Sequence, residues 1–193
     1  MEKLNGKKIN TAVFISGRGS NLRSLIKYCK KKNSPILIKL VISNNSKAKG
    51  LIYAKRSKIK KYITNLKNKT ISEKKLLKKL FKHKINLICL AGFMKILSGN
   101  FIKKFKKPIL NIHPSLLPKY KGLNTHKRVI KNKEKYSGST VHLVTAKLDS
   151  GKIILQKKIK VLKYENENTL EKKILKIEHE LYPEAIKKFL INL

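Results

Sequence analysis

Short apolar runs alternate with amphipathic stretches along the chain, and this alternation predicts an α/β protein. Runs rich in isoleucine, valine and leucine that are too short for a helix are typical of strands buried on both faces of a sheet. We expect about seven strands, at residues 9–16, 35–43, 60–64, 85–90, 108–111, 137–144 and 152–161. Because helical patterns separate most of them, they should form one mostly parallel sheet with helices on both faces. The last two strands are close in sequence and could pair antiparallel.

The helical patterns lie between these strands and after the last one. They predict a first helix that starts within residues 17–22 and ends at about residue 30. Further helices are predicted at residues 47–57, 73–82, 125–132 and 169–190. Ser20 or Asn21 can cap the first helix with a side-chain oxygen. Pro183 should kink or divide the last helix, because proline removes a backbone hydrogen bond. The chain shows no repeat or low-complexity linker, so residues 1–193 are expected to form a single domain.

The apolar pattern indicates neither a membrane segment nor a metal site. The first residues are polar, and no apolar run approaches the roughly 20 residues that a membrane helix needs. We therefore expect a soluble, cytoplasmic protein with no membrane partner. Cys29 and Cys89 are far apart and lack metal-ligand spacing, so they are interpreted as reduced core residues and no metal is predicted.

The charge of the chain has two interpretations. Lysine and arginine number 48 against 10 acidic residues, which gives a formal net charge of +38. A charge of this size can indicate a nucleic-acid-binding protein, or a composition in which lysine fills exposed positions. The few arginines and the spread of lysines over the whole chain favour the second interpretation. We expect no specific nucleic-acid partner, but nonspecific adhesion to nucleic acid at low salt.

Residues 17–22, with the sequence GRGSNL, join the first strand to the first helix. Glycines at such a turn let backbone N–H groups approach an anion at the positive end of the helix. The segment lacks the third glycine of a dinucleotide fingerprint and the Gly-Lys-Ser/Thr of a P-loop. A phosphate site and an ordinary tight turn both remain open on this segment alone.

Residues 91–97, with the sequence AGFMKIL, continue the apolar pattern past the end of a strand. Core packing is one interpretation of this segment. The other is a wall for a flat aromatic ligand, a contact for which Phe93 and Met94 are suited.

The segment NIHPSLLPKYKGLNTH, residues 111–126, is the most unusual in the chain. A strand places Asn111 and His113 on one face, because its side chains alternate with period two. Pro114 and Pro118 then force the chain out of the sheet, at the end where open α/β sheets bind ligands.

Asp149 is the only aspartate, and it lies in a turn after a later strand. A carboxylate near an imidazole favours proton transfer, and an amide such as that of Asn111 can donate to a developing oxyanion. No serine or cysteine is evidently coupled to His113, so the substrate should bring the nucleophile, as when an amine attacks an acyl carbon. His142 is interpreted as a hydrogen-bonded core histidine rather than a support of the site. His126 should lie at a helix start, and His83 and His179 are expected to be peripheral.

Taken together, these segments resemble the phosphoribosylglycinamide formyltransferase family, the folate-dependent enzymes of purine synthesis. The resemblance covers nearly the whole chain, through AVFISGRGSNL, LAGFMKILS, NIHPSLLPKYKGLNTH, STVHLVTAKLDSGKIILQ and IEHELYP. It implies a Rossmann-like formyltransferase fold. It also implies transfer of the formyl group of 10-formyltetrahydrofolate, a small-molecule co-substrate, to the amine of 5'-phosphoribosylglycinamide in the synthesis of IMP.

The resemblance also implies roles for individual residues. Asn111, His113 and Asp149 would be catalytic: the imidazole donates a proton, the amide polarises the formyl oxygen, and the carboxylate raises the histidine pKa and organises a water. Gly19, Ser20 and Asn21 would bind the ribonucleotide phosphate, and Glu178 would contact the glycinamide amine. Folate would be held by Met94, Lys95, Ile96 and Leu97, together with Asn111 and the loop at residues 145–149.

Some positions depart from the family pattern. Lys95 stands where the family usually has arginine, which removes a planar fork for a carboxylate. Ala146 and Lys147 replace acidic residues, and residues 69–73 offer no clear equivalent of a folate-contacting arginine.

Two related activities are alternatives, those of methionyl-tRNA formyltransferase and formyltetrahydrofolate deformylase. The first typically continues the LLPKY segment as RGAxP, whereas this chain has KGLNTH, and we expect no further tRNA-binding domain. The protein is expected to act as a monomer or weak homodimer.

Overall fold

The computed structural model describes residues 8–66 and 68–192, and within them seven strands form one sheet. The strands are β1 Ile9–Ile15, β2 Ile36–Ser43, β3 Lys60–Ile63, β4 Leu87–Leu90, β5 Ile109–His113, β6 Tyr136–Leu143 and β7 Ile153–Lys160. The helices are α1 Ser20–Cys29, α2 Leu51–Arg56, α3 Lys69–Lys82, α4 Gly99–Phe105, α5 Thr125–Lys131 and α6 Glu167–Ile191.

The strand order is β3-β2-β1-β4-β5-β6-β7. Strands β1 to β5 run parallel, whereas β6 pairs antiparallel with both β5 and β7. The prediction of a mostly parallel sheet with an antiparallel late pair is therefore confirmed. A short loop is enough to join β6 to β7, whereas each parallel pair needs a crossover.

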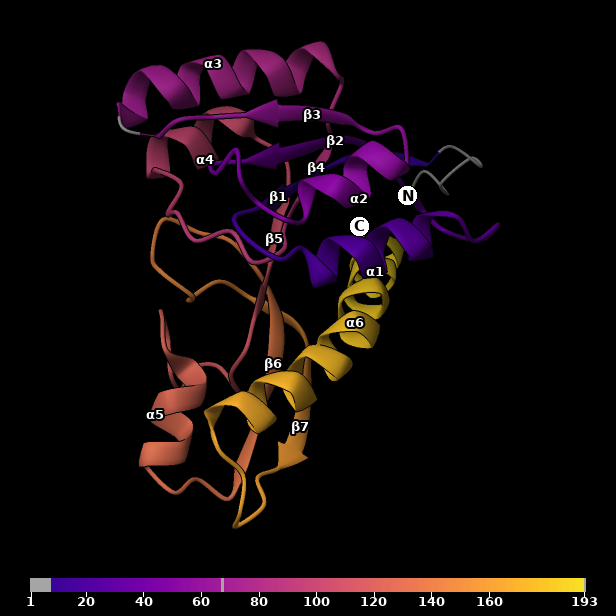
Figure 1. Ribbon diagram of the computed structural model, residues 1–193. Coiled ribbons are helices and arrows are strands. Elements are labelled where there is room, and N and C mark those ends of the chain that lie inside the picture. Colours follow the sequence, from indigo (N-terminus) through magenta and orange to yellow (C-terminus); the bar gives the residue numbers. More distant parts are fainter. Residues whose placement is uncertain (1–7, 67, 193) are drawn as a thin grey trace.

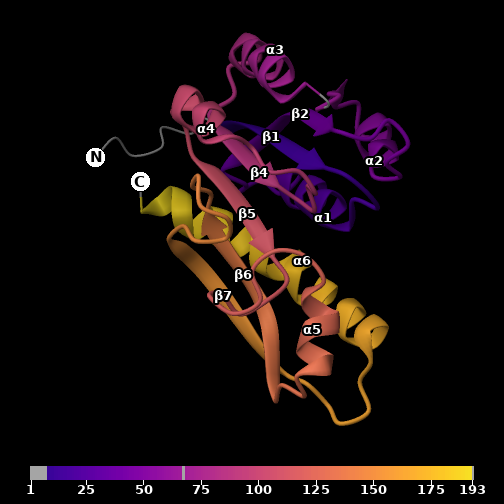
Figure 2. The ribbon, with the colours of Figure 1, turned by 90° about the vertical axis from the view of Figure 1, so that its left-hand side faces the viewer.

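Helices cover both faces of the sheet, as predicted. On β1, Val13 and Ile15 belong to the core shared with α1 and α6, whereas Ala12 and Phe14 belong to the core shared with α3 and α4. Figures 1 and 2 show these two helical layers on opposite sides of the strands. The central strands β1, β4 and β5 are buried on both faces and read as mostly apolar runs, whereas the outer strands β3 and β7 are largely exposed.

Some helices differ from their predictions. Helix α4 was not expected, although Ser98 caps it and the four-residue spacing of Phe101 and Phe105 buries one face. Helix α2 begins at Leu51, later than predicted, and α3 begins earlier, after the N-cap Asn68.

Helix α6 runs unbroken over 25 residues, so Pro183 does not divide it. Tyr182 and Ala185 on either side of the proline are completely buried. This burial holds the helix in place despite the missing backbone donor. A capping box between Asn166 and Thr169 fixes its first turn.

The cysteines form no disulfide. Cys89 is completely buried on β4, as predicted, whereas Cys29 is only partly buried at the end of α1. Burial raises the pKa of the Cys29 thiol to about 11, so it remains protonated at neutral pH. None of the helices in the described ranges is apolar over a length that would cross a bilayer.

The sheet reverses its winding between β1 and β4. The connection from β1 leads through α1 to β2 on one side, and the later connection through α3 leads to β4 on the other. Ligands of open α/β sheets bind outside the carboxyl ends of strands at such a switch point. Residues 17–22 follow β1 and residues 91–97 follow β4, so both predicted ligand segments flank this position.

Candidate active site

The site is built on the antiparallel pair of β5 and β6. Asn111 lies opposite His142, and His113 lies opposite Thr140. The side chains of Asn111 and His113 project from one face of β5, because they are two residues apart. Thr140 anchors the loop that follows β5: its Oγ1 donates to the carbonyl of Ser115 at 2.6 Å and accepts from the N–H of Leu117 at 3.1 Å.

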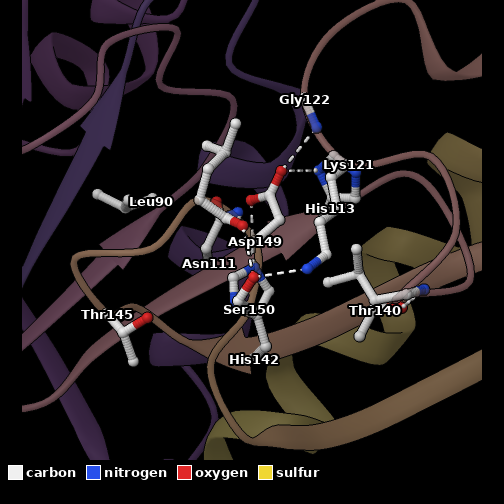
Figure 3. A network of polar contacts seen from close by, with 12 residues as sticks. Leu90, Asn111, His113, Lys121, Gly122, Thr140, His142, Thr145, Asp149 and Ser150 are labelled. Carbon is white, nitrogen blue, oxygen red and sulfur yellow. Dashed lines mark hydrogen bonds and ion pairs between the residues drawn. The ribbon is translucent and has the colours of Figure 1, made fainter.

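Asp149 lies between the two histidines, as Figure 3 shows. Its Oδ2 is 3.5 Å from His113 Nδ1, and its Oδ1 is 3.6 Å from His142 Nε2. The backbone N–H of Gly122 donates to Oδ2 at 2.9 Å. Asp149 has a positive φ of 43°, a conformation that aspartate tolerates better than most residues. The structure therefore brings the predicted carboxylate and imidazole together.

The hydrogen-bond partners determine which ring nitrogen carries the proton. His113 Nε2 is 2.9 Å from the carbonyl of Tyr120, and His142 Nδ1 is 2.8 Å from the carbonyl of Leu143. A carbonyl only accepts, so each of these nitrogens is a donor. His142 Nε2 then accepts from Asn111 Nδ2 at 3.1 Å. On this assignment, His113 Nδ1 is the nitrogen free to exchange a proton beside Asp149.

Burial lowers the pKa of His113, and it outweighs the carbonyl of Tyr120 and the carboxylate of Asp149, which raise that pKa. Burial also raises the pKa of Asp149, but the hydrogen bond from the Gly122 N–H and the neighbouring His113 help to hold it below its ordinary value. The expected upward influence of Asp149 on the histidine is therefore present, but the net shift is downward. At neutral pH the pair consists of a neutral imidazole beside a carboxylate.

His142 was interpreted as a core residue, and only part of that interpretation holds. Its side chain is buried and hydrogen-bonded, as expected. It also contacts both Asn111 and Asp149, which makes it a member of the site. In the sequence, the period-two alternation of residues 137–144 places His142 on a strand. Its position opposite Asn111 depends on the register of β6, which the sequence does not show.

The glycine turn after β1 is shaped by close packing. Gly19 is the N-cap of α1 with a φ of 73°, and neither Ser20 nor Asn21 caps the helix with its side chain. A Cβ on Gly19 would come within 2.6 Å of Gly50 Cα, so a side chain does not fit there. The first N–H groups of a helix have no partner within the helix, which leaves them available to an anion.

The side chain of Asn21 points to Glu178. Its Nδ2 donates to Glu178 Oε2 at 2.7 Å, and Ser139 Oγ lies 3.2 Å from Oε1. Asn21 is therefore committed to a protein contact through its side chain, and its backbone is what remains for a phosphate. Burial raises the pKa of Glu178 to about 7, against the hydrogen bonds from Asn21 and Ser139, which lower it.

The predicted folate segment divides into exposed and buried residues. Met94 is 63% exposed and Ile96 is 59% exposed, whereas Leu97 is 4% exposed and belongs to the core beneath α3 and α4. Lys95 is also exposed. Exposed apolar side chains at a switch point fit a ligand wall, but Leu97 could reach a ligand only through its backbone.

Ser115 Oγ donates to the carbonyl of Lys119 at 2.7 Å, so this hydroxyl is not paired with His113. Among residues 8–66 and 68–192, no three His, Cys, Asp or Glu side chains are grouped to hold a metal ion.

The profile of the formyl transferase family matches residues 9–186, a range that includes every residue of the predicted site. The chain belongs to the formyl transferase family. The phosphoribosylglycinamide formyltransferase of Haemophilus influenzae is 40% identical over 186 residues, which cover 95% of this chain and 87% of that protein. A solved phosphoribosylglycinamide formyltransferase from Brucella melitensis superposes with a TM-score of 0.90 at 41% identity, covering 95% of this chain and 96% of that one.

A third relative of this formyl transferase is much longer. The trifunctional purine biosynthetic protein adenosine-3 of Gallus gallus is 41% identical over 187 residues, and the match spans 19% of its length. These named relatives favour the phosphoribosylglycinamide activity over the methionyl-tRNA and deformylase alternatives.

The geometry of this formyl transferase supplies the parts that acyl transfer to an external amine requires. The amide of Asn111 has a second N–H besides the one that His142 accepts, and that N–H can stabilise an oxyanion. His113 Nδ1 can exchange a proton, and Asp149 can stabilise the resulting imidazolium.

Proposed function

We propose that this protein transfers the formyl group of 10-formyltetrahydrofolate to the amine of 5'-phosphoribosylglycinamide, in the synthesis of purine nucleotides. The observation that carries the proposal is the placement of Asp149 within 3.6 Å of both His113 and His142, with Asn111 bound to His142. The glycine turn and the exposed residues 94–96 flank this cluster at the carboxyl ends of the strands. The names of the relatives support the acceptor, phosphoribosylglycinamide, and the formyl group, and the folate donor is the one that the resemblance implies.

The proposed reaction needs one proton transfer between two nitrogens. The substrate amine attacks the formyl carbon, and the formyl oxygen becomes an oxyanion that accepts from the Asn111 amide. His113 Nδ1 takes the proton that the attacking nitrogen loses, and Asp149 stabilises the charged ring. The proton then passes to N10 of the folate, directly or through a water, as the bond from the formyl carbon to N10 breaks. The products are the formylated amine and tetrahydrofolate.

The substrates would occupy the two sides of the switch point. The N–H groups at the start of α1 would hold the ribonucleotide phosphate, and Met94, Lys95 and Ile96 would lie against the folate. Asn111 would contact its formyl end. Glu178 would act at the ribonucleotide end. Because both of its carboxylate oxygens contact protein groups, touching the substrate amine directly would require one of these contacts to open.

One assay tests the proposal. Purified protein is given 10-formyltetrahydrofolate with phosphoribosylglycinamide and methionyl-tRNA as competing acceptors, and the products are separated. We expect formylglycinamide ribonucleotide. Transfer to the tRNA alone, or release of formate without an acceptor, would replace the proposal with one of the two alternatives.

The cellular setting is also part of the proposal. We infer that residues 1–193 act as one cytoplasmic domain on small-molecule substrates, as a monomer or weak homodimer. Sedimentation of the active protein across a concentration series checks the oligomeric state, and a stable higher assembly would contradict it.

A further inference from the structure

A three-residue segment, residues 120–122, contacts both members of the proton-transfer pair. The carbonyl of Tyr120 accepts from His113 Nε2 at 2.9 Å, and the N–H of Gly122 donates to Asp149 Oδ2 at 2.9 Å. The first contact fixes the tautomer of the imidazole, and the second fixes one oxygen of the carboxylate. The position of His113 relative to Asp149 therefore depends on the backbone of this segment.

The backbone of this segment is unfavourable by itself. Tyr120 has a φ of 56°, in the left-handed region that a residue with a Cβ adopts rarely. Such a conformation persists only where the surroundings over-determine it. The contacts of the tyrosine side chain are among those that hold it.

Those contacts come from α5 and the residues just after it. The Tyr120 hydroxyl donates to Glu134 Oε1 at 2.8 Å and accepts from Asn132 Nδ2 at 2.9 Å. The Arg128 guanidinium lies 5.1 Å from the centre of the tyrosine ring, and its Nη1 donates to the carbonyl of Lys121 at 2.7 Å. Figure 2 shows α5 beside the lower part of β6, away from β1 and β4.

Glu134 is the charged acceptor in this group. Hydrogen bonds from Tyr120 and Lys119 lower its pKa, so it is a carboxylate at neutral pH. Hydrogen bonds to an ionised acceptor are stronger than those between neutral groups.

We propose that Glu134 is a positioning residue for the proton transfer: by binding the Tyr120 hydroxyl, it sets the Tyr120 carbonyl against His113 and the Gly122 N–H against Asp149. The proposal rests on the function proposed above for this site. Glu134 itself does not touch the reacting atoms.

The test compares three variants with the unmodified protein. Glu134→Ala removes the acceptor, Glu134→Gln keeps an oxygen for the tyrosine hydroxyl, and Lys119→Ala removes only the ion pair from Lys119 Nζ to Glu134 Oε1, 3.0 Å long. For each we would measure kcat, the KM of both substrates, the melting temperature, and the titration of His113 by NMR of its ring C–H group.

We expect Glu134→Ala to lower kcat roughly 10- to 100-fold with little change in either KM, because a small displacement of reacting groups has effects of this size. The His113 titration should move to lower pH, since the Tyr120 carbonyl raises the pKa of that ring. Glu134→Gln should restore most of kcat, and Lys119→Ala should leave both kcat and the titration unchanged.

Two results would overturn the proposal. One is an unchanged His113 titration in folded Glu134→Ala. The other is a loss of activity that Lys119→Ala reproduces, or that follows the melting temperature alone. If Glu134→Ala does not fold, Tyr120→Phe removes the same hydrogen bond and is subject to the same criteria. The titration needs no substrate, so it reports on Glu134 even if the assay for formylglycinamide ribonucleotide fails.

Discussion

The long first part of the chain, residues 1–133, and the shorter second part, residues 134–193, carry their acidic residues very differently. The first part contains two, Glu2 and Glu73, whereas the second part contains eight. Glu73 is buried, and its carboxylate accepts from the N–H of Ser98 at 2.8 Å and from the Ser98 hydroxyl. In the second part, Glu134 accepts from the Tyr120 hydroxyl, Asp149 from a backbone N–H and Glu178 from a side-chain amide.

The lysines and the carboxylates of this chain therefore have different roles in the structure. Lysine covers exposed positions throughout the chain, where the identity of a charged residue changes stability little. Glu73, Glu134, Asp149 and Glu178, by contrast, each accept a hydrogen bond from a particular donor in the fold. The amino ends of β1, β2 and β3 surround a cavity of about 620 Å³ lined by lysines and no acidic residue, at the end of the sheet away from Asp149.

Asp149→Asn should lower kcat by a factor on the order of 10² to 10⁴, because the amide cannot stabilise the imidazolium of His113. Asp149 raises the pKa of His113, so the acid limb of the pH profile should also move to lower pH. Steady-state kinetics from pH 5 to 8 measures both effects. Glu180→Gln, which removes an exposed acid from the same part of the chain, is the control. Equal rates in the two variants would remove Asp149 from the mechanism.

Glu178→Gln should change how stability depends on pH. The folded pKa of Glu178 is about 7, above its value in an unfolded chain, so the folded state holds a proton that the unfolded state releases. This contribution is fully present below the unfolded pKa and is lost as pH rises towards 7, by up to roughly 3 kcal/mol.

Urea unfolding of the unmodified protein and of Glu178→Gln between pH 5 and 8 measures the difference. Because glutamine mimics the protonated acid, the curve of the variant should be flatter. Parallel curves would show that Glu178 does not titrate in this range.

Glu73→Ala should destabilise the fold by about 1–3 kcal/mol, because it leaves the N–H and the hydroxyl of half-buried Ser98 without their acceptor. Lys75→Ala, at an exposed position of the same helix, should change the free energy of unfolding by less than about 0.5 kcal/mol. Chemical denaturation of both variants distinguishes them. A similar small effect in both would mean that Glu73 is as replaceable as the lysines around it.

Retention on immobilised DNA should show the smallest effect. Replacing Lys58 and Lys84, which line the cavity, with glutamate should weaken binding at low salt and reduce its salt dependence. The same change at exposed Lys172, which lies among acidic residues, should do less. Equal effects would indicate that the charge acts evenly over the surface.

The hydrophobic pattern was enough to predict the strands and the class of the sheet, because the central strands, which are buried on both faces, leave apolar runs in the sequence. It missed α4, whose single buried face is too short to stand out from the loop before it. Period-two alternation placed Asn111 and His113 together, and the scarcity of aspartate drew attention to Asp149.

Only the tertiary structure decided the rest of the candidate site. The register of β6 brings His142 to Asn111, the side chain of Asn21 binds Glu178, and Leu97 packs in the core. Burial reverses the expected direction of the His113 pKa. These features depend on contacts between segments that are far apart in the chain, so they cannot be predicted from local spacing and residue type.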